Sequence, residues 1–129
     1  MIDARTLLHV LESGRTVGPS HQLVAPASIR TQVMDLLLHK VQHDDLTEQD
    51  ALALHEKLTQ TKLRLLNDRV SRRIAWDIAR EKGWDTISQA ECLALVKLQA
   101  DALITIDADL AAAAAGIVPV ASLERLFRA

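Results

Sequence analysis

The chain has 129 residues, of which 49% are hydrophobic and 25% charged, and its formal net charge is −2. This composition is typical of a globular domain and excludes an intrinsically disordered chain. The near-neutral charge provides no overall electrostatic basis for nucleic-acid binding. The length predicts one domain over residues 1–129, large enough for a real core.

Cysteine usage and apolar stretches set two further expectations. A single cysteine, Cys92, cannot form an internal disulfide and suits a reducing cytosol. The longest uncharged stretch, residues 110–123, contains a glycine and a proline and is too short to span a membrane. No signal peptide is recognised before the first predicted strand, so we expect a cytoplasmic protein with no membrane partner.

The hydrophobic pattern predicts strands and helices that alternate at both ends of the chain, with a mostly helical middle. In chain order it predicts a strand at 1–2, a helix at 4–13, a strand at 23–25, helices at 29–41 and 47–58, a strand or turn at 63–66, helices at 70–83 and 88–98, a strand at 103–106, a helix at 108–115 and a strand at 117–118. The predicted N-caps and helix ends are Ser28, Thr47, Ser88, Gly14, Gly83 and Gly116. The predicted class is α/β, with a small parallel central sheet flanked by helices.

Two aspartates stand where a predicted strand gives way to a predicted helix. Asp3 follows the first strand, and Asp107 follows the apolar run at 103–106. Because the strand ends of a parallel α/β sheet converge on one crevice, these two carboxylates are expected to meet at a single site.

Several segments, taken in order and spacing, resemble the PIN domain, the nuclease fold of VapC-type toxins from toxin–antitoxin pairs. The resemblance covers nearly the whole chain. The segments that carry it are Ile2-Asp3-Ala4 with its leucine-rich helix, Val24-Ala25-Pro26 followed by Ile29, Val33 and Leu37, Gln89 to Leu95, and Ala102 to Asp107 with Leu110.

This resemblance implies a PIN-like sandwich in which four acidic residues hold Mg²⁺ or Mn²⁺ for cleavage of RNA. The first acidic position falls on Asp3 and the last on Asp107, whereas the second falls on Gln32 and the third on Gln89. A PIN-like toxin would also have a small antitoxin protein as its partner, and the family often forms homodimers through its helices.

The two glutamines halve the expected charge of the acidic ring. Each lost charge pair near 4 Å is worth about 4 kcal/mol at an effective dielectric of about 20, before desolvation. Asp35, three residues after Gln32 on the same helix, and Asp109, beside Asp107, are the predicted additional metal ligands. Glu91 follows Gln89 by two residues and is expected on a poorly aligned helix face.

Structural roles compete with each of these assignments. Asp3 and Asp107 each precede a helix and can be N-caps. Gln32 and Gln89 can be partly buried polar residues, and Asp35 an exposed helix acid.

Other reactive groups have simpler interpretations. His39 and His43 have a zinc-compatible spacing but no evident third ligand, and Cys92 is expected to be a small core residue. Residues 62–82 carry seven basic side chains against three acidic ones. That run is expected to be the solvated face of a helix, although it could contact a phosphate backbone.

Three functions are therefore open. The first is a metal-dependent ribonuclease restrained by an antitoxin. The second is a PIN-like module that binds RNA or a protein without cutting, which the two glutamines favour. The third is an unrelated α/β domain with a small-molecule pocket, which a large separation of Asp3 and Asp107 would favour.

Overall fold

A computed structural model describes residues 1–67 and 69–128. Short strands separate single helices or consecutive pairs of helices along the chain. The elements are α1 (Ala4–Ser13), β1 (Val24–Pro26), α2 (Ile29–Gln42), α3 (Glu48–Gln60), β2 (Arg64–Leu66), α4 (Arg69–Lys82), α5 (Ser88–Gln99), β3 (Leu103–Ile104), α6 (Ala108–Ala114), β4 (Val120–Ala121) and the 3₁₀ helix η1 (Leu123–Phe127). Within the described chain, no helix has the length and apolar character needed to cross a bilayer.

The strands form two short parallel ladders that the first two residues join. Strand β1 pairs with β2, and β3 pairs with β4. The N–H of Ile2 donates to the carbonyl of Val24 (3.0 Å), and the N–H of Ile104 donates to the carbonyl of Met1 (2.9 Å). The lateral order is therefore β2, β1, residues 1–2, β3 and β4, with the strands in two two-stranded parallel sheets. This arrangement agrees with the predicted α/β class, although two small sheets stand in place of one central sheet.

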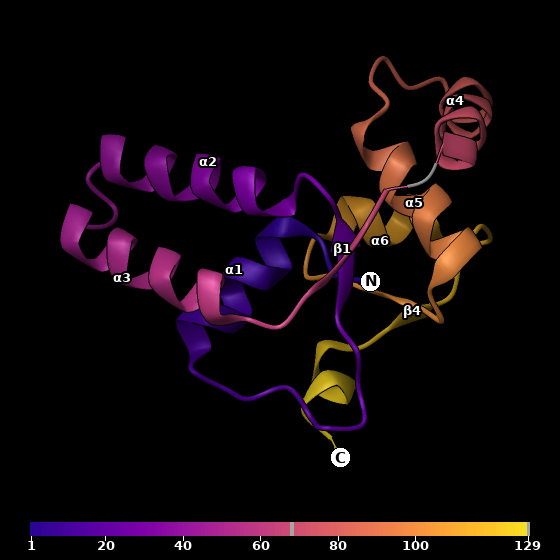
Figure 1. Ribbon diagram of the computed structural model, residues 1–129. Helices are drawn as coiled ribbons and strands as arrows, with labels where there is room; N and C mark the ends of the chain where they lie inside the picture. The colour runs from indigo at the N-terminus through magenta and orange to yellow at the C-terminus, as the bar shows by residue number, and fades with distance from the viewer. Residues whose placement is uncertain (68, 129) are drawn as a thin grey trace.

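Helices cover both faces of this sheet because successive strand residues point to opposite sides. Val24 and Leu103 belong to a core cluster with α4, α5 and α6. Ile2 and Ala25 belong to a second cluster with α1, α2 and α3. Figure 1 shows the two groups of helices on opposite sides of β1.

Local signals in the sequence account for several helix boundaries. Gly14 follows α1 with a φ of 69°, a left-handed conformation that favours glycine at a helix end. The side chain of Thr47 accepts a hydrogen bond from the N–H of Asp50 (3.1 Å), as the capping pattern predicts. Ser88 is the first residue of α5, and Ile87 occupies the cap position.

The strand predicted at 117–118 is wrong. The N–H groups of Ile117 and Val118 donate to the carbonyl of Ala114 (2.9 and 3.1 Å), so these residues complete the end of α6. Pairing with β3 begins only afterwards, when the carbonyl of Pro119 accepts a hydrogen bond from Leu103 (2.8 Å). The N–H groups of this apolar pair are therefore used in hydrogen bonds at the end of a helix and not in strand pairing.

The C-terminal segment packs against the loop that follows α1. The guanidinium of Arg15 forms an ion pair with Glu124 (2.8 Å) and lies 3.8 Å from the ring centroid of Phe127. The N–H of Gly18 donates to the carbonyl of Leu126 (2.9 Å). Leu126 of η1 is buried in the same core cluster as Ile2 and Ala25.

Candidate active site

A pocket of about 200 Å³ lies at the carboxyl ends of the strands. It brings together all four positions that the resemblance assigns to the acidic ring, together with Glu91 and Cys92. Its chemically functional side chains include Asp3, Gln32, Gln89, Glu91, Cys92 and Asp107. The expected convergence of Asp3 and Asp107 on one site is therefore observed.

The start of each surrounding helix positions these side chains. Gln32 lies in the first turn of α2, Gln89 in the first turn of α5, and Asp107 is the N-cap of α6. Helix N-termini carry unpaired N–H groups and a partial positive charge. The pocket consequently combines carboxylates with backbone donors suited to an anion.

Glu91 differs from the sequence expectation, because it lines the pocket although it was expected on a poorly aligned face. The pocket lies over the first turn of α5, where side chains from several faces reach it; Ser88, Gln89 and Cys92 line it as well. The Glu91 carboxylate forms no hydrogen bond or ion pair with any residue from 1–67 or 69–128.

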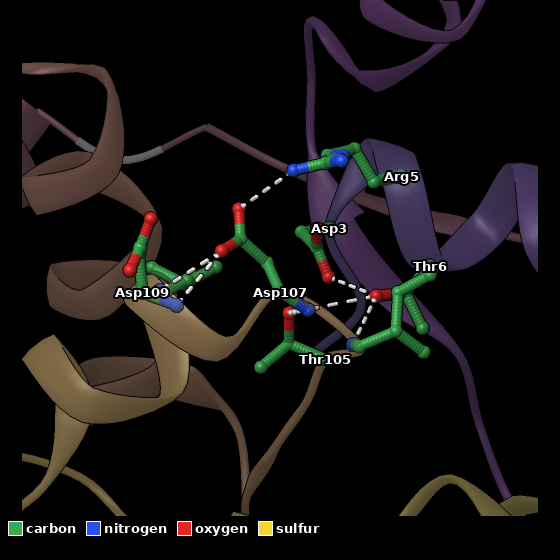
Figure 2. A network of polar contacts seen from close by, with 8 residues as sticks. Asp3, Arg5, Thr6, Thr105, Asp107 and Asp109 are labelled. Atoms are coloured by element: carbon green, nitrogen blue, oxygen red, sulfur yellow. Dashed lines mark hydrogen bonds and ion pairs between the residues drawn. The ribbon is translucent and has the colours of Figure 1, made fainter.

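Asp35 and Asp109 are not among the residues that line the pocket. Both side chains are exposed. Asp35 lies almost one turn beyond Gln32 along α2, and in Figure 2 the Asp109 carboxylate lies beyond Asp107, away from Asp3. Their predicted role as metal ligands would require a change of side-chain position and stays a prediction.

A threonine that sequence reasoning missed connects the two aspartates. Thr6 is fully buried, and its hydroxyl donates to Oδ1 of Asp3 while accepting from the N–H of Ile106 (2.9 Å). The hydroxyl of Thr105 lies 3.5 Å from that of Thr6 and accepts from the N–H of Asp107 (3.0 Å). Figure 2 shows this network, which fixes one strand end against the other.

Asp107 has a structural role in addition to its place in the pocket. Its Oδ1 accepts from the N–H groups of Asp109 (3.0 Å) and Leu110 (3.2 Å), which caps α6. Its Oδ2 lies 3.5 Å from the guanidinium of Arg5, a largely exposed side chain. The N-cap interpretation is confirmed for Asp107, and Arg5 partly neutralises its charge.

Asp3 differs from Asp107. It occupies the cap position of α1, but its side chain makes no capping hydrogen bond to the helix backbone. Its carboxylate is held instead by the Thr6 hydroxyl. Asp3 is therefore the carboxylate of the pair with the greater capacity for an external ligand.

The donor set fits a weakly held hard cation. Among residues 1–67 and 69–128, no three histidine, cysteine, aspartate or glutamate side chains lie close enough together to hold a metal ion by themselves. Mg²⁺ usually retains several waters and is bound through one or two carboxylates plus substrate phosphates. Asp3 and Asp107 suit that mode of binding, whereas an all-protein cage does not fit.

The thiol of Cys92 is unsuited to nucleophilic catalysis. Burial, and secondarily the nearby Asp3 carboxylate, raises the pKa of the Cys92 thiol to about 12. The thiolate is the reactive form, so this group is inert near neutral pH. The side chain is buried among the residues of α5, as expected of a small core residue.

A larger cleft, about 790 Å³, lies near the amino-terminal end of β1. It is lined by apolar residues of α1 and by basic side chains that include Lys57 and Arg64, and its lining contains no aspartate or glutamate. Hard cations need such oxygen ligands, so the smaller pocket is the better candidate for metal chemistry.

Comparison with known protein families and curated proteins identified no relative of this chain. The functional interpretation therefore rests on the residues of the pocket and on the stated resemblance.

Proposed function

We propose that this protein is a PIN-like, metal-dependent endoribonuclease with low cation affinity. The observation that carries the proposal is the convergence of Asp3, Gln32, Gln89 and Asp107 on one pocket. A parallel strand order with helices on both faces supports the same assignment. A large separation of the two aspartates would have favoured an unrelated small-molecule domain, and the two instead line the same pocket.

In this proposal Asp3 and Asp107 hold Mg²⁺ or Mn²⁺. The cation, when bound, activates water and stabilises the charge that develops on the phosphodiester. Because two of the four acidic positions are amides, the RNA phosphate supplies part of the cation's coordination, so cation and substrate bind together.

The other pocket residues have roles that follow from their chemistry. Gln32 and Gln89 can donate hydrogen bonds to phosphate oxygens, and the N-termini of α2 and α5 favour negative charge at the same place. Glu91, whose carboxylate is without an ion pair among the described residues, is the proposed proton acceptor for the attacking water.

A second function is a PIN-like module that binds RNA or a protein partner without cutting. The engagement of the Asp107 carboxylate by the α6 backbone and by Arg5 favours it, because a cation would have to compete with both. A small antitoxin partner and a homodimer stay proposals that rest on the resemblance alone.

Cleavage of a mixed RNA pool in Mg²⁺ or Mn²⁺ distinguishes the two functions. We expect metal-dependent cleavage by the wild type and its loss in Asp3→Asn, a substitution that removes no helix cap. Cleavage that survives in Asp3→Asn, or that proceeds equally in a chelator, would eliminate the proposed centre. Binding without cleavage in every protein would establish the second function.

A further inference from the structure

Helix α4 presents an arginine-rich face around an exposed tryptophan. Its buried face comprises Ser71, Ala75, Ile78 and Ala79, which turn toward the core. At 3.6 residues per turn, four exposed residues fall within an arc of about 60° on the outward side of the helix. These four residues, which we term the α4 stripe, are Arg69, Arg73, Trp76 and Arg80.

Trp76 is the informative member of the α4 stripe. A solvated helix face requires only polar side chains, yet 56% of Trp76 is exposed to solvent. The chain contains two tryptophans, one phenylalanine and no tyrosine, so a scarce aromatic residue stands at an outward position between arginines. Tryptophan and arginine are both enriched among the residues that contribute most to binding at interaction surfaces.

The charge around Trp76 is mainly positive. The acids of α4, Asp77 and Glu81, lie to one side of the stripe, and Arg72 extends it on the other. Arg73 forms an ion pair with Asp77 at 3.4 Å, but both side chains are more than half exposed, so the pair is weak and solvent-screened. Arg69, Arg72 and Arg80 form no ion pair with any described residue.

We propose that the α4 stripe binds single-stranded RNA, with the arginines on phosphates and a base stacked on Trp76. This inference deepens the proposed function by assigning a substrate-binding surface outside the pocket. Base–aromatic stacking and phosphate pairing require this combination of side chains and no particular base sequence. A duplex would bind less well, because its bases are already stacked within the helix.

The position of α4 connects this surface with the pocket. Helix α4 packs against α5, and residues 83–87 lead from one to the other. The first turn of α5 contributes Gln89 and Glu91 to the pocket. Figure 1 shows α4 beside α5. RNA held along α4 would therefore lie next to the helix whose first turn lines the pocket.

The test is RNA binding measured in a chelator, where cleavage cannot occur, by the fluorescence anisotropy of a labelled single-stranded oligonucleotide. Trp76→Ala should weaken binding by about fivefold to a hundredfold. Each of Arg69→Gln and Arg80→Gln should weaken binding and lower the slope of log affinity against log salt by about 0.7. Leu52→Ala on α3, whose side chain is also 56% exposed, and Lys57→Gln are matched controls that should leave affinity unchanged.

A second readout reports stacking directly. The second tryptophan of the chain, Trp84, is first replaced by phenylalanine (Trp84→Phe) so that Trp76 is the only fluorescent indole. Single-stranded RNA should then quench the fluorescence of Trp76, and duplex RNA should quench it less. The proposal would be overturned if the stripe variants and the controls lost RNA affinity equally. It would also be overturned if Trp76→Ala bound RNA as tightly as the wild type. Binding of an acidic polypeptide in preference to RNA would assign the surface to a protein partner and overturn it too. Because the chelator removes divalent cations, these results remain interpretable if the nuclease proposal fails.

Discussion

The buried hydroxyl of Thr6 holds the candidate site together at the scale of single atoms. It donates to Asp3 and accepts from the main-chain N–H of Ile106, so it satisfies two polar groups that lie far apart in sequence. A buried donor or acceptor left without a partner costs about 1–3 kcal/mol. The geometry of the two aspartates therefore depends on a residue with no direct role in chemistry.

Thr6→Val removes the hydroxyl at nearly constant volume and should lower the free energy of unfolding by about 1–3 kcal/mol. Urea unfolding followed by circular dichroism measures the loss. Thr6→Ser, which keeps the hydroxyl, should recover most of it, and Thr31→Val on the exposed surface of α2 should change stability by less than about 0.5 kcal/mol. A loss of the same size in Thr31→Val would contradict the assigned role.

Cys92 is expected to make the free energy of unfolding depend on pH in the alkaline range. Its pKa is about 12 in the folded chain and near 9.0 in the unfolded chain, so between these values the folded state binds more protons. The unfolding free energy is therefore unaffected below pH 9 and falls as pH rises above it, by at most about 1.4 kcal/mol per pH unit. Unfolding curves from pH 8 to 11 should show this slope in the wild type and a shallower one in Cys92→Ala. Equal slopes would show that the thiol does not titrate as described.

At the residue scale, the sequence indicated the aspartates and glutamines of the pocket. It did not indicate Thr6 and Thr105, whose hydroxyls hydrogen-bond to the two aspartates. Asp3 and Asp107 were visible because each follows an apolar run. Thr6 lies three residues after Asp3 and Thr105 two before Asp107, spacings common for local side-chain hydrogen bonds. That signal is present in the sequence, but the long-range bond from Thr6 to Ile106 becomes visible only when the strands are placed side by side.

At the scale of elements, the site is built from helix starts and strand ends. Helices α2, α5 and α6 all begin at the pocket, and the strand-end residues Asp3 and Pro26 line it between them. At the start of α6 one side chain fulfils two tasks, because the Asp107 carboxylate caps the helix and also lines the pocket. Structural and chemical roles are therefore superimposed at Asp107.

Two substitutions at Asp107 separate these roles. Asp107→Asn keeps an acceptor for the N–H groups of Asp109 and Leu110, so it should preserve stability while weakening cation binding. Asp107→Ala removes the cap and should also cost about 1 kcal/mol of unfolding free energy. Thermal unfolding of both variants, with and without Mn²⁺, measures the two effects. If the two variants are equally stable, the cap contributes nothing measurable.

Helices were easier to predict than strands because their signals repeat. The apolar spacing and the caps placed every α-helix to within a few residues, and the left-handed glycine after α1 marked its end. The strands are two or three residues long, too short for an alternating pattern to identify them. The apolar pair Ile117–Val118 resembles the true pairing segment Val120–Ala121, and only hydrogen bonding separates them.

At the scale of the whole molecule, a close backbone contact joins the loop after α1 to the C-terminal segment. A Cβ built on Gly18 would lie 2.0 Å from the carbonyl oxygen of Arg128, so no larger residue fits without moving the C-terminal segment. The same loop is held by the Arg15–Glu124 ion pair and by the Gly18–Leu126 hydrogen bond. The packing of the C-terminal segment is thus sensitive to one glycine.

Gly18→Ala should therefore displace η1 and destabilise the fold by about 1–3 kcal/mol, the usual cost of overpacking. Hydrogen exchange should show faster amide exchange in residues 122–128 than in the wild type, with the pocket residues unchanged. Unaltered exchange in that segment would contradict the contact.

Fold class and the place of the site could be predicted because the parallel strand order follows from alternating elements, and strand ends converge in any such sheet. Glu91 could not be placed correctly, because helix periodicity assigns residues to faces along a helix. The pocket lies instead at the amino-terminal end of α5, where residues from several faces reach it. Whether the pocket holds a cation depends on charge and distance among side chains from four segments, which no local pattern contains.

The most direct test of the account is the Mn²⁺ affinity of three proteins, measured by titration calorimetry in the presence of a non-cleavable RNA analogue. The account predicts weak binding by the wild type, loss in Asp3→Asn, and tightening by at least about tenfold in the double variant Gln32→Glu/Gln89→Asp, because two carboxylates are returned to the ring. If the double variant binds Mn²⁺ no better than the wild type, the pocket is not a degenerate metal centre and the central claim is wrong.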